Sequence, residues 1–524
     1  MSTQLAKYFF KIYNLYQERT NKMTKKILYW LDRNFIIFAT ANKIQEKVDV
    51  EKYAIIDDVE DQKEFYTNQS LINFKKMWHF TDFVQVKSTK PDIKLLKNFE
   101  QKYSINFWHT AYTERLFYSK INLYTKFDKT QILFLFQQEC QFFEKVLDEI
   151  KPDCLIISTI TQHHMFLLYQ ICKARGINIL TMEPIHIGGK WVITSTVDRH
   201  IDPDEYEKFL PHSNKKFEEL QEYLREYKPL RQGHKDITRY QTSKMAKVKA
   251  ASNFLLKSNS EEKHFAVYGK TKSSVFRKGT ARAQQSRKNK RKEFIDKNFI
   301  KKINFTDKII YYPLTYEPEK SILLGSPFYT NQIALIANIA KSIPVEYTLY
   351  VKEHPGMEEQ GWREILYYEQ LLDLPNIKLI HPSVSNEELV KNCVLAMTIR
   401  GTVGLEAAFY GKPAINFSFN SGYSELQSVS TIDNIEKLPE IIRTSLNRKV
   451  NLDDVNKYLD YMSMISFDYD HTDFTSEFSK KFNFQVGYLH KVKIEPDELS
   501  SFLSEYDNMF DLIADKFFDK IKNL

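Results

Sequence analysis

The chain has 524 residues, of which 43% are hydrophobic and 27% charged, and its formal net charge is +8. This composition excludes collagenous, disulfide-scaffold and wholly disordered proteins, and the length suits two or three domains. The four cysteines form no CxxC pair, so we predict neither a zinc ribbon nor a redox motif. We also expect no cofactor. No apolar run approaches the ~20 residues of a membrane span. The N-terminal segment has no secretory signal pattern, so we expect a cytoplasmic protein.

Strands and helices alternate over residues 1–234. Four apolar runs predict strands, and helical spacing predicts helices over 132–150 and 165–174; the strands are Lys26–Trp30, Tyr53–Asp58, Cys154–Ile157 and Ile177–Met182. The segment 183–190 then reads as a loop at the carboxyl end of a strand. Such loops line ligand crevices in open α/β sheets.

Positive charge is concentrated between Lys235 and Lys302, where 20 Lys and Arg stand against 5 Asp and Glu. The densest part is 277–292. This stretch attracts polyanions, but it has no regularly interleaved aromatics and no nucleic-acid motif of fixed spacing. We therefore favour a solvated connector, or contact with an anionic membrane surface and peripheral association with the inner membrane face, over specific nucleic-acid binding.

A second, more regular α/β run begins at Lys308. Predicted strands lie at 308–312, 347–351, 377–380, 394–398 and 414–417, with helices at 331–342, 386–392 and 405–410 between them. The remaining ~80 residues look mostly helical and polar. We predict an α/β protein with two Rossmann-like domains facing a cleft, over 1–234 and 303–445. A basic helical connector spans 235–302, and a helical C-terminal segment spans 446–524.

A glycine turn opens the predicted helix at 405–410. The turn is Arg400-Gly401-Thr402-Val403-Gly404, with Glu406 one turn further along. The N–H groups at a helix start favour an anion, Thr402 is a suitable capping residue, and Arg400 suits bidentate contact with phosphate. The spacing matches neither a dinucleotide-binding motif nor a P-loop, and a plain capped turn remains the competing interpretation.

Two further loops carry chemistry at strand ends. In Lys352-Glu353-His354-Pro355 the proline holds His354 extended, where its imidazole can contact a phosphate or act as an acid. The segment Tyr316–Glu319 carries two carboxylates, Glu317 and Glu319, which could bind sugar hydroxyls, serve as a base or be plain loop charges. Taken alone, the Tyr316–Glu319 motif favours the interpretation that these carboxylates are ordinary charges on a loop.

The N-terminal half offers a looser set of acid–base residues without specific spacing: Asp57, Asp58, His163, His164, Glu183 and His186. Adjacent His163 and His164 are not expected to face one site from a helix. No two-histidine helical zinc spacing occurs, so we predict no catalytic metal.

The C-terminal half resembles bacterial capsule and surface polysaccharide biosynthesis proteins, which are related to the Kdo transferases of capsule assembly. The resemblance covers about residues 305–425 and is carried by three motifs: Tyr-Pro-Leu-x-Tyr-x-Pro-Glu at 312–319, Val-Lys-Glu-His-Pro at 351–355, and Gly-Thr-Val-Gly-Leu-Glu-Ala-Ala-Phe-Tyr-Gly-Lys-Pro at 401–413. It implies a GT-B glycosyltransferase fold, with the nucleotide sugar in the C-terminal domain and the acceptor in the N-terminal domain. This sequence departs from the Kdo-transferase pattern, which is richer in Gly and Ser at the last motif.

The implied activity is metal-independent transfer of a sugar from a nucleotide-sugar donor to a capsular polysaccharide or glycolipid acceptor. In such an enzyme, a helix start and basic side chains stabilise the leaving phosphate. The donor-binding residues would be Lys352, Glu353, Arg400, Gly401, Thr402, Glu406, Lys412 and Glu319. The catalytic candidates are His354, Glu183, His186 and Asp57, since an inverting enzyme needs a base for the acceptor hydroxyl.

Three alternatives stay open at this point. A nucleotide-sugar 2-epimerase and a polyol-phosphate transferase of the teichoic acid type would share the fold class. A non-enzymatic scaffold that binds polyanions through 235–302 would depend on the basic segment alone.

Overall fold

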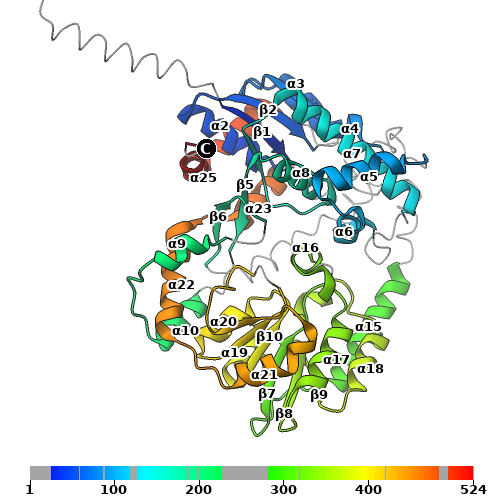
Figure 1. The fold of residues 1–524 in the computed structure, drawn as a ribbon, viewed down its shortest axis with the longest axis vertical. Helices are drawn as coiled ribbons and strands as arrows, with labels where there is room; N and C mark the ends of the chain where they lie inside the picture. The colour runs from blue at the N-terminus through cyan, green and yellow to red at the C-terminus, as the bar shows by residue number, and fades with distance from the viewer. Residues whose placement is uncertain are drawn as a thin grey trace, which may run out of the picture.

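The computed structural model describes residues 25–522 except for 33, 58–59, 86–88, 118–126, 186–187, 198–199, 227–280, 318, 419–420 and 483–493. These residues form two α/β lobes, each built around its own sheet (Figure 1). The N-terminal lobe is drawn mainly in blue and cyan, with the last helices of the chain in orange to red beside it, and the C-terminal lobe mainly in green and yellow.

The N-terminal sheet has the strand order β13-β6-β5-β4-β1-β2-β3. Neighbours from β5 through β3 are parallel, while β6 pairs antiparallel with both β5 and β13. The strands are β1 Lys26–Leu31, β2 Glu51–Ile56, β3 Lys76–His79, β4 Cys154–Ile157, β5 Asn178–Pro184, β6 Lys190–Thr194 and β13 Phe467–Asp468. The helical segments of this lobe are α2 Ile36–Lys47, α3 Glu60–Asn68, α4 Phe80–Phe83, α5 Ile93–Tyr103, α6 Phe107–Thr113, η1 Arg115–Phe117, α7 Lys129–Ile150 and α8 His163–Ala174.

The C-terminal sheet is entirely parallel, in the order β12-β11-β10-β7-β8-β9. Its strands are β7 Lys308–Pro313, β8 Tyr347–Lys352, β9 Ile377–Ile380, β10 Cys393–Thr398, β11 Ala414–Asn416 and β12 Val429–Thr431. The helical segments around it are α15 Ala281–Asn298, α16 Lys320–Gly325, η3 Pro327–Tyr329, α17 Gln332–Ser342, η4 Pro355–Glu358, α18 Ile365–Leu372, α19 Asn386–Asn392, α20 Val403–Phe409, η5 Ile435–Lys437 and α21 Leu438–Leu446.

Within the described residues, the chain passes from the N-terminal lobe to the C-terminal lobe after β6 and returns after α22 Leu452–Ile465. Helices α9 Pro203–Lys208 and α10 Phe217–Glu226 bury Tyr206 and Leu220 in one core of the C-terminal lobe. The helices α23 His471–Lys481, α24 Pro496–Ser504 and α25 Asp507–Ile521 then pack into the core of the N-terminal lobe. The domain ranges expected from the sequence stay a proposal. The packing adds that α9 and α10 lie with the C-terminal lobe and that α23, α24 and α25 lie with the N-terminal lobe.

The carboxyl ends of both sheets approach each other through α6 and α16. Helix α16 follows β7, and together with η3 it contacts α6 of the N-terminal lobe. Glu114, directly after α6, accepts a hydrogen bond from the backbone of His163, which begins the helix after β4. The loops at these two sheet edges therefore belong to one region of the molecule.

The alternation of strands and helices is confirmed, including strand β4, whose four residues are all buried. Parallel strands covered on both faces read as continuous apolar runs, which makes them easy to recognise. The loop expected over 183–190 follows a strand as predicted, but it is shorter: β5 runs through Pro184 and β6 begins at Lys190. Glu183 therefore lies in a strand, paired with Val192, and the loop joins two antiparallel strands.

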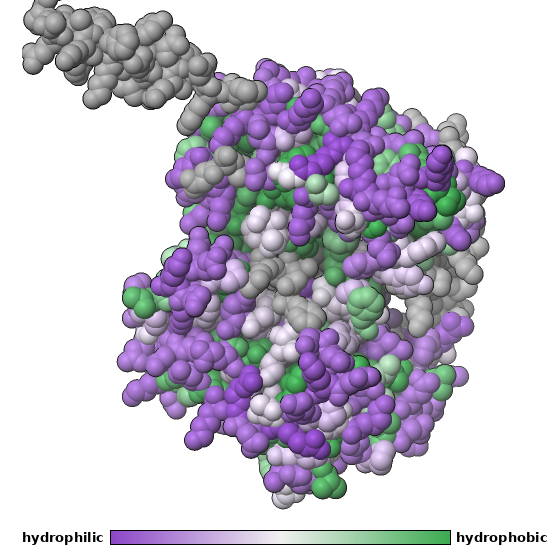
Figure 2. Space-filling model, in the orientation of Figure 1, coloured by the Kyte–Doolittle hydropathy of each residue, from purple (hydrophilic) through white to green (hydrophobic). Residues whose placement is uncertain are grey.

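All four cysteines are buried and free. Among the described residues, none of the helices is long and apolar enough to cross a membrane. The face drawn in Figure 2 is largely hydrophilic, with small apolar patches between the charged side chains.

Candidate functional site

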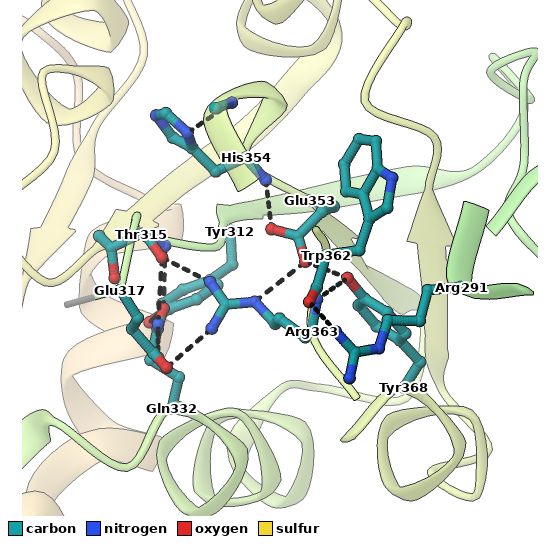
Figure 3. A network of polar contacts seen from close by, with 11 residues as sticks. Arg291, Tyr312, Thr315, Glu317, Gln332, Glu353, His354, Trp362, Arg363 and Tyr368 are labelled. Carbon is teal, nitrogen blue, oxygen red and sulfur yellow. Dashed lines mark hydrogen bonds and ion pairs between the residues drawn. The ribbon is translucent and has the colours of Figure 1, made fainter. Parts of the chain in front are cut away.

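A buried ion pair anchors the loops at the carboxyl edge of the C-terminal sheet (Figure 3). The carboxylate of Glu353, directly after β8, accepts from Arg363 Nε at 2.9 Å and from the Tyr368 hydroxyl at 2.7 Å. Arg363 also donates to the Thr315 carbonyl at 2.6 Å and pairs with Glu317 at 2.8 Å. The loops after β7 and β8 are thus fastened to each other through one guanidinium.

Glu353 itself is 0% exposed. Burial raises the pKa of this carboxyl, and the Arg363 guanidinium, the Tyr368 hydroxyl and the His354 backbone N–H oppose that shift. Lys352 is also buried and donates to the side chain of Asn386. Both residues are engaged by the protein, so their expected contact with the donor would be indirect, through the loop that they hold.

His354 points away from this network (Figure 3). Its Nδ1 accepts from the Gly356 N–H at 3.1 Å and so caps η4, and its ring meets the edge of Tyr316. The ring is half-buried, which places an oriented imidazole at the surface of the loop. Its contact with a phosphate stays a prediction.

Arg400 follows β10 by two residues and is 9% exposed. Its guanidinium lies against Gly325, the last residue of α16: a Cβ at that glycine would sit 1.5 Å from Nη1. The glycine is therefore what makes room for the cation. Through this contact Arg400 joins the β10 loop to the element that touches the N-terminal lobe.

The turn after Arg400 differs from the expected anion cradle in two respects. Thr402 is helical in backbone conformation and caps nothing, because its hydroxyl donates to Glu406 at 2.6 Å. The Gly401 N–H donates to the Thr398 hydroxyl at 2.9 Å. A Cβ at Gly401 would lie 2.8 Å from that same hydroxyl, so the glycine serves this close turn.

Two further donor-site candidates lie apart from this turn. Lys412 follows the far end of α20 and its charge acts on Cys393, at the start of β10, so it belongs to the amino edge of the sheet. Glu319 is exposed and precedes α16, on the edge that faces α6. The structure thus brings Arg400, Gly401, Thr402 and Glu406 together, with the His354 loop two strands away, and leaves Lys412 outside.

Asp32, directly after β1, is a residue that the sequence analysis missed. It is half-buried, and it accepts from the Ser158 hydroxyl at 2.8 Å and from the Asn34 N–H at 3.1 Å. Burial raises its pKa to about 6; those hydrogen bonds oppose the shift, and the charge of nearby Asp57 adds to it. Burial raises the pKa of nearby Tyr469, and the negative charge of Asp32 adds to that rise.

The proton on Asp32 is held more tightly in the folded chain than in the unfolded one. The stability that this group contributes therefore falls as pH rises from about 4 to about 6. A carboxylate that is costly to ionise, at the carboxyl end of a strand, is a candidate for acid–base chemistry. Its position directly after the Lys26–Leu31 strand is the signal in the sequence that could have found it.

The other catalytic candidates of this lobe are buried or undescribed. Asp57 is 4% exposed and contacts His164, while Glu183 lies within β5 and is 4% exposed. Asp58 and His186 lie outside the described residues. The expectation that His163 and His164 cannot face one site is wrong: one ligand atom of each lies within 4.8 Å of the other and of Glu139. This arrangement is possible because they occupy the first turn of α8.

The basic stretch 277–292 is described only in part. Arg291 donates to the backbone carbonyls of Gly361 and Trp362 and pairs with Glu364, so it fixes α15 to the C-terminal lobe. Lys292 pairs with Asp296 on the same helix. Arg287 and Lys290 are exposed. Contact with an anionic surface stays a prediction, and Arg291 is the residue least suited to it.

Comparisons with known proteins agree with the motifs. Residues 207–420 match the family model described as capsule polysaccharide biosynthesis protein, which confirms the resemblance seen in the sequence. The matched segment starts in α9 and ends after β11, so it spans the site-bearing loops of the C-terminal lobe up to that point. No curated protein matches the chain.

Solved structures of similar arrangement include the beta Kdo 2,7 transferase KpsC of Thermosulfurimonas dismutans. It has 13% identity and a TM-score of 0.29, covering 61% of this chain and 79% of that one. The UDP-GlcNAc 2-epimerase of Methanocaldococcus jannaschii has 14% identity and a TM-score of 0.24, covering 84% and 99%. The trehalose-6-phosphate phosphatase N-terminal domain of Candida albicans has 12% identity and a TM-score of 0.29, covering 88% and 97%. Likeness at this level assigns no activity.

Replacing Glu353 by alanine should lower the free energy of unfolding by about 3–5 kcal/mol, because it leaves the Arg363 guanidinium buried without its main partner. Urea denaturation followed by circular dichroism measures the change. Glu364→Ala is the matched control: Glu364 is exposed and pairs with Arg291, so its loss should cost at most about 1 kcal/mol. Equal losses in the two variants would contradict the anchoring role.

Proposed function

We propose that this protein is a glycosyltransferase that moves a sugar from a nucleotide-sugar donor to a surface polysaccharide or glycolipid acceptor. The observation that carries the proposal is the placement of Arg400 and His354 on loops at one edge of the C-terminal sheet, inside the segment that matches the capsule biosynthesis family. In open parallel sheets, ligands bind at this edge.

On the donor side, the C-terminal lobe supplies positive charge for a phosphate that leaves the sugar. Arg400 is held between the β10 loop and α16, so its guanidinium is oriented before the donor arrives. His354 is oriented by its bond to the Gly356 N–H. Preorganised donors of this kind stabilise charge that develops in the transition state, without reorganising at the moment of reaction.

On the acceptor side, Asp32 is suited to take the proton of the attacking hydroxyl. A base works best when its pKa lies near the working pH, and burial brings the pKa of Asp32 to about 6. The residue follows β1 at the edge where α6 of the N-terminal lobe meets α16 of the other. The acceptor hydroxyl would approach from this lobe, opposite the donor phosphate.

A thermal-shift panel with CMP, UDP, GDP and CDP tests donor recognition first, because a nucleotide that binds the folded state raises the melting temperature by mass action. We expect one nucleotide to do so. Incubation with the corresponding labelled nucleotide sugar and a lipid-linked or oligosaccharide acceptor should then move the label to the acceptor. Epimerised nucleotide sugar, or transfer of a polyol phosphate, would replace the proposal by one of the alternatives. If none of the four nucleotides raised the melting temperature, the proposed function would be rejected.

Arg400→Ala should raise the apparent constant for the nucleotide sugar more than that for the acceptor, since the guanidinium is assigned to the donor phosphate. Gly325→Ala should act in the same direction while leaving the arginine in place, because the new methyl group displaces its guanidinium. Steady-state kinetics with either substrate varied measures both effects. Exposed Arg443→Ala provides the control. If Arg400→Ala and Gly325→Ala raised only the apparent constant for the acceptor, the assignment of Arg400 to the donor phosphate would be overturned.

His354→Asn should reduce turnover by about 10²–10³ while preserving the fold, because asparagine retains an acceptor for the Gly356 N–H but no imidazole.

Asp32→Asn should reduce turnover by about 10²–10⁴ and leave nucleotide binding intact. In the wild type, kcat/KM should rise with pH through a midpoint of about 6, since only the ionised carboxylate accepts a proton. A profile that is flat between pH 5 and pH 7, about one unit to either side, would reject Asp32 as the base.

A further inference from the structure

A closed cluster of histidines and carboxylates lies inside the N-terminal lobe, and one of its members, Asp57, is near Asp32. It joins Asp57 after β2, Glu114 after α6, Glu139 on α7, and His163 and His164 at the start of α8. All five side chains are between 0% and 4% exposed. Aromatic rings surround them: Phe117 and Phe136 lie against His163, and Trp30 and Phe80 against His164.

Each imidazole has one nitrogen bound to a carboxylate from another element. His163 Nδ1 lies 2.7 Å from Glu114 Oε2, which also accepts the His163 backbone N–H at 2.9 Å. His164 Nε2 lies 3.2 Å from Asp57 Oδ2. Histidines that bind metals show this pattern, in which an outer carboxylate fixes the ring and its tautomer while the other nitrogen faces the ion.

The remaining donor atoms converge on Glu139. His163 Nε2 lies 2.8 Å from Glu139 Oε1, and one ligand atom from each of Glu139, His163 and His164 falls within 4.8 Å of the others. Glu139 Oε2 and His164 Nδ1 are buried, and neither has a hydrogen-bond partner among the described residues. Leaving buried polar atoms unpaired is unfavourable, so these two atoms indicate a ligand.

The charge of the cluster points to a cation. Three carboxylates from three elements face two imidazoles. The described contacts of His163, His164, Glu139 and Asp57 include no lysine or arginine. Buried carboxylates shielded by aromatic rings are costly to keep charged without a cation beside them, and a divalent ion would supply one.

We propose that Glu139, His163 and His164 bind one divalent transition-metal ion, with Glu114 and Asp57 orienting the two histidines. Two imidazoles and a carboxylate are the ligand chemistry of Zn²⁺, which we take as the resident ion. Both nitrogens of His163 now face carboxylate oxygens, so the ring carries two protons; the ion takes the place of the Nε2 proton, which is released to solvent. Because the site is closed, the ion would tie α7 to α8 and hold Asp57 beside Asp32.

Metal analysis of tag-free, full-length protein tests this proposal independently of any transfer activity. After dialysis against a chelator, titration with Zn²⁺ in competition with a chromophoric chelator should show one tight site per chain. The melting temperature should rise with Zn²⁺. Co²⁺ in its place should give the intense visible bands of a four-coordinate ion bound by nitrogen and oxygen. This spectral readout needs no variant.

Glu139→Gln should weaken Zn²⁺ binding by more than about 100-fold, and Asp57→Asn by about 10–100-fold, the usual cost of losing an orienting carboxylate. Exposed His212→Gln should leave binding unchanged. The proposal fails if the folded wild type takes up no Zn²⁺ and its melting temperature is the same with metal and with chelator. It also fails if Glu139→Gln binds Zn²⁺ as tightly as the wild type, which would place the ion elsewhere.

Discussion

The ion pair between Glu353 and Arg363 is the contact on which the C-terminal edge depends. Both groups are buried, so the free energy of desolvating them is recovered only while each keeps its partners. The pair holds the end of β8 against the loop after β7, and His354 projects from the segment it holds. A site built on loops is thereby given the rigidity that catalysis requires of its scaffold.

In the proposed transfer, the two lobes contribute groups of opposite charge. The C-terminal edge presents the cation Arg400 and the imidazole of His354, whereas the N-terminal edge presents the carboxylate of Asp32. A transfer from a phosphate leaving group to a hydroxyl nucleophile needs this division: positive charge where negative charge departs, and a base where a proton is lost. The contact of α6 with α16 places the two edges close to each other.

Most of the strand and helix pattern could be predicted because buried parallel strands are continuous apolar runs, as at Cys154–Ile157. Strand β6 could not, because it is defined by its antiparallel partners, one of which lies hundreds of residues later. The raised pKa of Asp32 likewise comes from burial created by the fold. At Thr402 the residue type favoured a helix cap, but its hydroxyl donates to the Glu406 carboxylate instead of capping the helix.

The return of the C-terminal helices affects the order in which the protein can acquire its structure. Helix α25 packs against α2, with Lys43 and Lys47 paired to acidic residues of α25, and it fills one face of the first sheet. During synthesis from the N-terminus, α2 and α3 cover that face only in part until α25 has left the ribosome. The N-terminal lobe is therefore completed after the C-terminal lobe although its synthesis begins first, and its partly exposed apolar face favours chaperone binding in the interval.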